Sequence, residues 1–176
     1  VYKRQEENNQ IELEAKKYGI DVYRGSEENV ISRFLEIIDK YKPRYILRLT
    51  GDKPIFDPEI HTKALKFLYE DKFDYISNNM PSSWPHGFDV EAFTSVSLAK
   101  SYKLSKSKEN IEHVTAFLRA SPHFKRANLY NIDKKYRKLR FTIDYQEDLN
   151  FLNDFLGQNS NHNNIDNWFQ IKNHLD

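Results

Sequence analysis

The stretch RLTGDKPIFDPEI, Arg48 to Ile60, decides how this chain folds. The apolar and β-branched run that leads into it, RYILRLT, indicates a buried strand. Asp57 and Pro58 together predict a helix start, because the carboxylate caps free N–H groups and proline suits the first turn. Asp52 lies between the two elements in a Gly-Asp-Lys-Pro turn. A carboxylate at that point serves either as a turn device or as part of a metal site.

Strands and helices alternate along the rest of the chain. Apolar residues at helical spacing, with caps and stops at the ends, predict helices over 11–18, 27–41, 58–68, 95–104, 109–119, 146–156 and 165–175. Short β-branched or alternating runs predict strands over 20–24, 44–50, 73–79, 88–94, 124–132 and 139–145. Ser26 is the expected cap of the second helix, and Gly157 is the expected stop of the sixth. This order predicts an α/β domain with parallel βαβ units and a partly mixed sheet.

Composition narrows the function classes. The chain has 176 residues, 39% hydrophobic and 30% charged, which suits one folded domain. The net charge of +1 argues against a general nucleic-acid binder. The absence of cysteine excludes disulfides, thiolate zinc sites and a cysteine nucleophile. With no apolar run of spanning length and no visible signal peptide, we expect a cytoplasmic protein that does not bind membranes.

Two aspartates follow predicted strands and form the candidate site. Asp52 comes after YILRLTG, and Asp144 comes after LRFTI. Ligands of open α/β sheets bind beyond the carboxyl ends of the strands, so the two carboxylates converge if these strands are neighbours. Two carboxylates with substrate phosphates are ligands that Mg²⁺ accepts. Arg48 and Arg140 lie on the same strands and could offset phosphate charge.

Five segments in order resemble the cytidylyltransferase family of sugar-nucleotide synthetases, and most closely its SpsF-like spore-coat-polysaccharide branch. They are VYRGSEENVISRF, RLTGDKPIFDPEI, DYISNNMPSSWPHGFDVEAF, IEHVTAFLRA and LRFTIDYQEDLNFL. This branch is related to the acylneuraminate and KDO cytidylyltransferases. The resemblance implies a Rossmann-like α/β/α sandwich of the nucleotide-diphospho-sugar transferase type, with a mixed, mostly parallel sheet.

The resemblance also implies a reaction, in which CTP and a sugar give a CMP-sugar and pyrophosphate for surface polysaccharide biosynthesis. It assigns Asp52 and Asp144 as catalytic carboxylates that hold Mg²⁺. The substrate-binding side chains that it implies are Arg24, Arg33, Arg48, Asn78, His86, Asp89, His113 and Arg140. Each has a structural alternative: an arginine on a helix is usually solvated, an asparagine at a strand end can make a turn, and a helical histidine is more often structural.

The tripeptide Asp89-Val-Glu91 leaves a further alternative open. Two acids around one residue are typical of the metal site of a glycosyltransferase. The same alternation also fits a strand edge that faces solvent.

Departures from the family pattern carry expectations of their own. Relatives begin with a strand and a glycine- and arginine-rich loop that holds the triphosphate, and this chain, with only 5 glycines, contains no such loop. We therefore expect residues 1–176 to be one nucleotidyltransferase-like domain, the C-terminal portion of a longer protein, with residues 1–9 disordered or artefactual. Such a fragment could be inactive, and a non-catalytic sugar-binding or assembly module is the alternative. A homodimer is compatible with the family.

Overall fold

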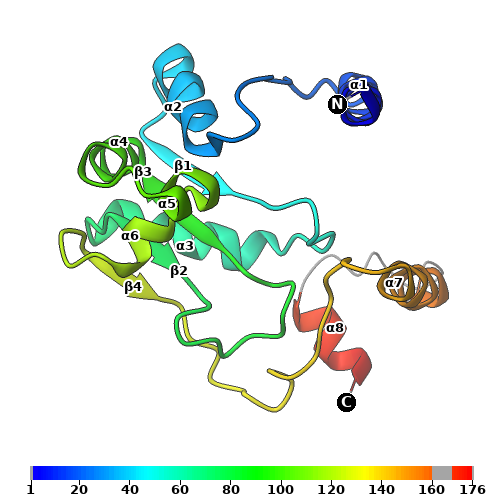
Figure 1. The fold of residues 1–176 in the computed structure, drawn as a ribbon. Helices are drawn as coiled ribbons and strands as arrows, with labels where there is room; N and C mark the ends of the chain where they lie inside the picture. The colour runs from blue at the N-terminus through cyan, green and yellow to red at the C-terminus, as the bar shows by residue number, and fades with distance from the viewer. Residues whose placement is uncertain (1, 160–167, 176) are drawn as a thin grey trace.

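A computed structural model describes residues 2–159 and 168–175 (Figure 1). Its sheet has four strands in the order β1-β3-β2-β4. The strands are β1 (Tyr45–Arg48), β2 (Tyr75–Ser77), β3 (Glu91–Thr94) and β4 (Arg126–Asn128). β3 pairs antiparallel with both β1 and β2, and β2 pairs parallel with β4. β1, β2 and β4 therefore share one direction, as a mixed, mostly parallel sheet requires.

The strand register places charged and polar residues at one edge of the sheet. Arg48, the last residue of β1, pairs with Glu91, the first residue of β3, and Glu91 also pairs with Ser77 at the end of β2. The carboxyl ends of β1 and β2 thus meet the start of β3. The loops that follow these ends carry four of the candidate residues, Asp52, Asn78, His86 and Asp89.

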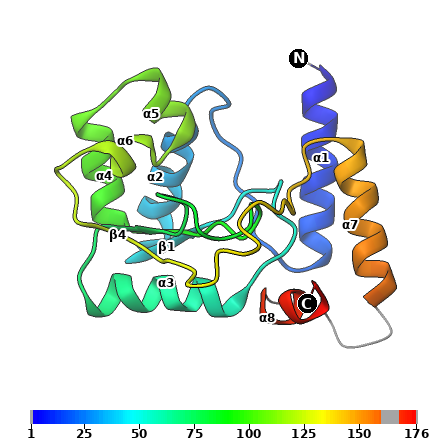
Figure 2. The ribbon, with the colours of Figure 1, turned by 90° about the horizontal axis from the view of Figure 1, so that it is seen from below.

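Helices cover both faces of the sheet. On one face lie α2 (Val30–Tyr41), α4 (Ser95–Leu104), α5 (Lys108–His113) and α6 (Ala116–Ala120), and on the other lies α3 (Pro58–Glu70) (Figure 2). One core cluster, with Ile31, Phe93 and Leu98, fills the first face. A second, with Ala64, Leu68 and Ile76, fills the face under α3. The result is an α/β/α sandwich.

The C-terminal helices extend the second core cluster. Leu152 of α7 (Gln146–Asn159) and Trp168 and Ile171 of α8 (Trp168–Leu175) are buried in it. The predicted cap Asp57 accepts hydrogen bonds from the N–H groups of Glu59 and Ile60, and its second oxygen accepts one from Trp168 N–H at 2.7 Å. The cap of α3 therefore also fastens α8.

Helix α1 (Tyr2–Lys17) stands away from the sandwich and is joined to it by the irregular segment 18–29 (Figure 1). It includes most of residues 1–9, for which the sequence predicts disorder or an artefactual origin. Within the described ranges, no helix combines the length and the apolar character needed to cross a lipid bilayer.

Several predicted elements differ in the structure. Residues 20–24 form no strand, and Asn29, rather than Ser26, caps α2. The predicted helix 109–119 is split into α5 and α6 at Val114, whose φ is +59°. Gly157 lies inside α7 instead of ending it. Residues 165–167 of the last predicted helix lie outside the described part of the chain.

The sequence predicts a strand over 139–145, and this prediction is wrong, because segment 139–143 forms no strand of the sheet. The segment pairs through an isolated bridge between Arg140 and His86, with hydrogen bonds from His86 N–H to Leu139 and from Phe141 N–H to His86. The segment bonds to the loop after β2 because the backbone N–H and carbonyl groups of His86 in that loop pair with Phe141 and Leu139.

Candidate active site

Asp52 and Asp144 come from segments that lie side by side. The Lys53 N–H donates to the Thr50 carbonyl at 3.2 Å, which closes the expected turn around Asp52. The Ile143 N–H donates to the Asp52 carbonyl at 2.8 Å, so the residue before Asp144 is bonded directly to Asp52. The sequence placed these segments together as neighbouring strands, whereas a backbone hydrogen bond between two loops joins them.

Asp144 and Asp148 are two carboxylates that share Arg140 as a partner, and Asp144 is the more exposed of the two. Its Oδ2 accepts hydrogen bonds from Arg140 at 2.5 Å and from the Thr142 hydroxyl at 3.1 Å. Asp148 accepts from the Asp144 and Tyr145 N–H groups, both at 2.9 Å, and pairs with Arg140 at 2.8 Å. The backbone hydrogen bond from Asp144 is the main cause that lowers the pKa of Asp148. Asp148 thus fixes the turn on which Asp144 is carried.

Asp52 is kept ionised by its surroundings. Partial burial acts to raise the pKa of Asp52, but the Thr50 hydroxyl, a backbone N–H and the nearby Lys53 and His86 outweigh it. The pKa of Asp52 therefore lies below its ordinary value. An ionised carboxylate is the form that binds a divalent cation.

Lys53 and His86 gather around Asp89. Lys53 Nζ lies 3.0 Å from Asp89 Oδ2, and His86 Nε2 lies 3.9 Å from the same oxygen. The Gly87 N–H also donates to this oxygen, at 3.3 Å. The loop after β1 and the loop 78–90 between β2 and β3 therefore meet at one carboxylate.

Arg48, partly buried, forms a second ion pair with the buried Glu91. Arg48 Nη1 lies 2.5 Å from Glu91 Oε2, while Tyr75 and Thr115 donate their hydroxyls to Oε1 at 2.6 and 2.8 Å. Burial acts to raise the pKa of Glu91, but these partners together lower it, and burial beside Glu91 raises the pKa of Tyr75. Glu91 is 7% exposed, so the solvent-facing edge considered for Asp89-Val-Glu91 is wrong.

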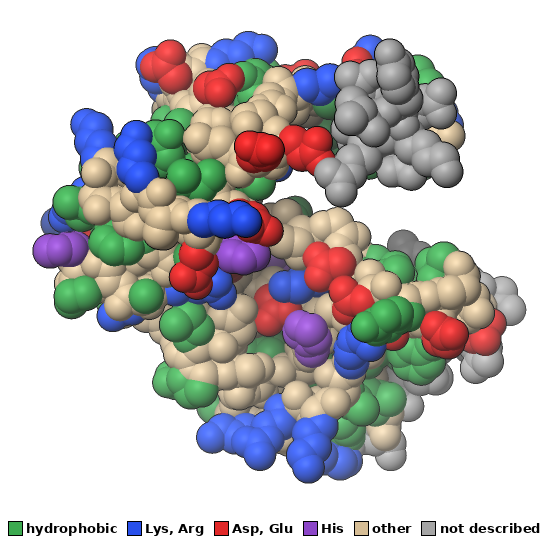
Figure 3. Space-filling model, viewed as in Figure 1, with side chains coloured by type: hydrophobic (Ala, Val, Ile, Leu, Met, Phe, Trp, Pro, Cys, Tyr) green, Lys and Arg blue, Asp and Glu red, His purple; other side chains and the backbone are tan. Residues whose placement is uncertain are grey.

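A cavity of about 130 Å³ opens beside the Lys53–Asp89 and Arg48–Glu91 pairs, and neither Asp52 nor Asp144 is in its lining. Its lining includes Arg48, Lys53, Asp89 and Glu91, together with His61 of α3 and Asn79 after β2. Figure 3 shows basic, acidic and histidine side chains gathered around a hollow in the middle of one face. The cavity thus lies at the carboxyl edge of β1 and β2, where an α/β sheet holds its ligands.

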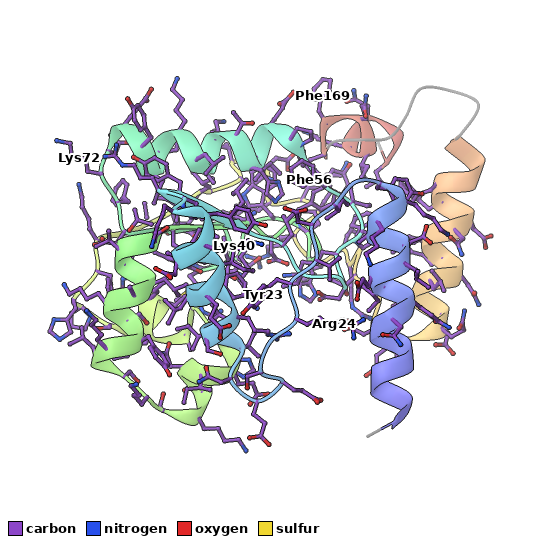
Figure 4. The ribbon with its side chains drawn as sticks, turned by 90° about the horizontal axis from the view of Figure 1, so that it is seen from above. Tyr23, Arg24, Lys40, Phe56, Lys72 and Phe169 are labelled. Atoms are coloured by element: carbon purple, nitrogen blue, oxygen red, sulfur yellow. The ribbon has the colours of Figure 1, made fainter. Side chains whose placement is uncertain are left out.

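Other predicted site residues lie elsewhere or are engaged within the fold. Arg24 points toward α1 and pairs with Glu12 at 2.6 Å (Figure 4). Arg33 packs against Gly25, and His113 is exposed at the end of α5. Asn78 is 1% exposed, donates to the Phe88 carbonyl and accepts from the Val90 N–H. None of the four is among the residues that line the cavity.

Sequence reasoning missed His61, Asn79, Tyr75 and Thr115. His61 follows Ile60 on the buried side of α3. This position next to the apolar stripe was the only sign in the sequence that, of the 6 histidines, His61 would be buried. Tyr75 and Thr115 gave no signal, because their role depends on where Glu91 lies.

The described residues contain no group of three or more His, Cys, Asp or Glu side chains that could hold a metal ion. The metal site at Asp52 and Asp144 therefore stays a prediction.

Comparisons with known proteins agree with this arrangement. The cytidylyltransferase family profile matches residues 5–167. The MJ1063 protein of Methanocaldococcus jannaschii is 33% identical over 148 residues, which cover 82% of this chain and 59% of that protein. The spore coat polysaccharide biosynthesis protein SpsF of Bacillus subtilis is 32% identical over 140 residues, covering 78% of this chain and 58% of SpsF.

A solved structure, a cytidylyltransferase from Leptospira borgpetersenii, superposes with a TM-score of 0.79 at 27% identity. The match covers 86% of this chain and 64% of that one, and it confirms the Rossmann-like fold. The chain thus spans about three fifths of the length of the relatives that it matches. By its sequence and by its fold, the chain belongs to the cytidylyltransferase family.

Proposed function

We propose that the protein transfers a cytidylyl group from CTP to a sugar, giving a CMP-sugar and pyrophosphate for surface polysaccharide biosynthesis. The observation that carries the proposal is the hydrogen bond from Ile143 N–H to the Asp52 carbonyl, which brings the Asp52 and Asp144 segments to one edge of the sheet. Membership of the cytidylyltransferase family supports the reaction class, and the name of the SpsF relative supports the polysaccharide setting.

In this reaction a sugar hydroxyl oxygen forms a bond to the α-phosphorus of CTP. The bond from that phosphorus to the oxygen bridging to the β-phosphorus breaks, pyrophosphate leaves, and the hydroxyl proton passes to solvent. The protein contributes mainly position and electrostatic stabilisation. At the cavity, Asp89 and Glu91 pair with Lys53 and Arg48 and hold these two side chains in place.

Asp52 and Asp144 would hold Mg²⁺ together with phosphate oxygens of the substrate. When bound, the ion offsets negative charge on the phosphates and on the leaving pyrophosphate. The lowered pKa of Asp52 fits this role, since the carboxylate stays ionised. Arg140 and Thr142 hold one oxygen of Asp144, which orients that carboxylate.

The glycosyltransferase alternative loses support in the structure. Asp89 pairs with Lys53, and Glu91 pairs with Arg48 and accepts two hydroxyl hydrogen bonds. These partners already occupy the two acids that would have to bind a metal. The cytoplasmic location and a homodimer remain predictions.

The test measures CTP-dependent release of pyrophosphate with Mg²⁺ and a panel of sugars. It should use both the 176-residue chain and the longest in-frame product of its gene. We expect release with CTP and a matching sugar, and a loss of at least a hundredfold in Asp52→Asn and Asp144→Asn. Asp39→Asn, on the exposed side of α2, is the matched control and should retain activity.

Three results would decide against the proposal. No release from either form with any sugar would remove the transferase. Sugar binding that CTP does not affect would favour the non-catalytic module. Transfer from a preformed nucleotide-sugar that is lost in Asp89→Ala would favour the glycosyltransferase.

A further inference from the structure

His61 carries a bare hydrogen-bond acceptor inside the protein. The side chain is 4% exposed, and its Nδ1 lies 2.6 Å from the Asp57 carbonyl oxygen. A carbonyl only accepts, so the ring hydrogen is on Nδ1 and Nε2 is left with a lone pair. Burial is the main cause that lowers the pKa of His61, which keeps the ring neutral at neutral pH. The Phe56 ring stacks on it at 4.3 Å between centroids and fixes its plane.

Asn79 supplies a second acceptor of the same kind. Among the described residues, neither His61 Nε2 nor Asn79 Oδ1 has a hydrogen-bond partner, although both atoms are buried. Both side chains line the cavity beside Lys53 and Asp89. A third such atom, Thr50 Oγ1, belongs to the same lining and can donate as well as accept. A buried polar atom without a partner costs about 1–3 kcal/mol, so three of them at one cavity call for a partner that the described fold does not supply.

The chemistry of these atoms selects the kind of ligand. Phosphate oxygens carry lone pairs and would be repelled by two acceptors, whereas hydroxyl groups can donate to both. Lys53 and Arg48 are each paired with a carboxylate, and Arg119, which also lines the cavity, adds a positive charge that suits an acidic sugar. The cavity therefore suits a hydroxyl-rich group better than a triphosphate.

We propose that His61 Nε2 and Asn79 Oδ1 accept hydrogen bonds from sugar hydroxyls, so that this cavity selects the sugar substrate and the triphosphate lies outside it. The inference rests on the proposed function for the identity of the ligand as a sugar. Ribose hydroxyls or the cytosine amino group of the nucleotide offer similar donors, and the experiment must separate these sources.

The direct test follows the imidazole nitrogens of the ¹⁵N-labelled protein by NMR, with His61→Gln used to assign the signal. The probes are glycerol, glucose, N-acetylglucosamine, a 2-keto-3-deoxy sugar acid, cytidine and pyrophosphate, each added alone. We expect the Nε2 signal of His61 to shift with at least one sugar and not with cytidine or pyrophosphate. A shift with cytidine alone, or with no probe, overturns the inference; the latter would leave a buried water as the partner.

Affinity measurements give a second readout for the sugar that shifts the signal. His61→Phe keeps the stacking on Phe56 but loses the acceptor, and should weaken sugar binding about tenfold. His61→Gln restores an acceptor and should recover most of the affinity, while Thr62→Val, the exposed neighbour, should leave it unchanged. An analogue without the donated hydroxyl should bind the unmodified protein and His61→Phe equally. If His61→Phe weakens binding of the analogue as much as it weakens binding of the sugar, a direct hydrogen bond from that hydroxyl to His61 is contradicted.

The two proposals fail in different ways. The NMR shift needs no CTP, so a sugar-induced shift without CTP turnover would keep the sugar cavity and remove the transferase. Turnover of CTP without any shift at His61 would keep the transferase and overturn this inference alone.

Discussion

Glu91 shows how one buried side chain organises the edge of the sheet. It begins β3, beside the ends of β1 and β2, and binds Arg48, Tyr75 and Thr115. A buried carboxylate is tolerated only when it is paired and hydrogen-bonded, and here three partners meet that need. Glu91 therefore acts as an anchor that holds Arg48 at the cavity.

Glu91→Gln should test this anchor. The amide cannot balance the Arg48 charge and can accept fewer hydrogen bonds, so we expect a loss of about 2 kcal/mol in the free energy of unfolding at pH 7. Urea denaturation followed by circular dichroism measures it. Glu112→Gln, on an exposed helix position, is the control and should change stability little. Equal stability of the two variants would show that the Arg48 pair contributes nothing.

The pH dependence of stability should follow from the same carboxylate. The pKa of Glu91 is lower in the folded protein than in the unfolded chain. Its contribution is thus fully present above the unfolded pKa of about 4.3 and is lost as the pH falls through the folded pKa. Stability measured between pH 7 and pH 3 should fall less steeply in Glu91→Gln than in the unmodified protein. Parallel profiles would contradict the assignment.

Segment 139–143 is positioned by the loop between β2 and β3, residues 78–90, and Gly87 in this loop makes the contact possible. Gly87 has a φ of +109°, and a Cβ built on it would lie 2.6 Å from the Phe141 carbonyl oxygen. A side chain would push away the segment that leads to Asp144. The placement of the second aspartate therefore depends on a glycine far from it in sequence.

Gly87→Ala should destabilise the protein by about 2–3 kcal/mol, because backbone strain and a backbone clash add. Gly157→Ala is the matched control: it lies in α7 with open space around it, and should be neutral or stabilise by up to about 1 kcal/mol. Thermal unfolding of both variants measures the difference. If Gly87→Ala is as stable as the control, segment 139–143 can move away from the new side chain without a loss in the free energy of unfolding.

The break between α5 and α6 has a tertiary cause. Helical spacing predicted one helix over 109–119, and local propensity alone gives no reason to interrupt it. The interruption at Val114 places the Thr115 hydroxyl against Glu91. A long-range hydrogen bond to a buried charge outweighs the local preference for a continuous helix.

At the scale of the whole molecule, we propose that the described elements unfold as one domain. The 2 tryptophans, Trp84 and Trp168, lie 6.5 Å apart between ring centroids and join the loop after β2 to α8. The Asp57 cap adds α3 to this contact. Tryptophan fluorescence thus reports on α8 packing, and far-UV circular dichroism reports on the helices as a whole.

Denaturation followed by the two signals should give coincident transitions with one midpoint. An earlier fluorescence transition would show that α8 detaches before the sandwich unfolds. Asp57→Ala, which removes both the α3 cap and the Trp168 hydrogen bond, should lower both midpoints together, with a loss of about 1–2 kcal/mol in the free energy of unfolding. Asp71→Ala, at the other end of α3, is the control and should have little effect.

The sequence by itself determined the α/β class, the turn around Asp52, the Asp57 cap and the family, because these depend on local periodicity, capping chemistry and ordered motifs. It also predicted that the Asp52 and Asp144 carboxylates converge if their segments are neighbours, and this stays a prediction. Only the tertiary structure decided that a loop hydrogen bond joins their segments, that Asn78 holds backbone groups of the loop before β3, and that His61 and Asn79 border the cavity. The physical reason is that burial and hydrogen-bond partners are set by distant segments, which no local pattern encodes.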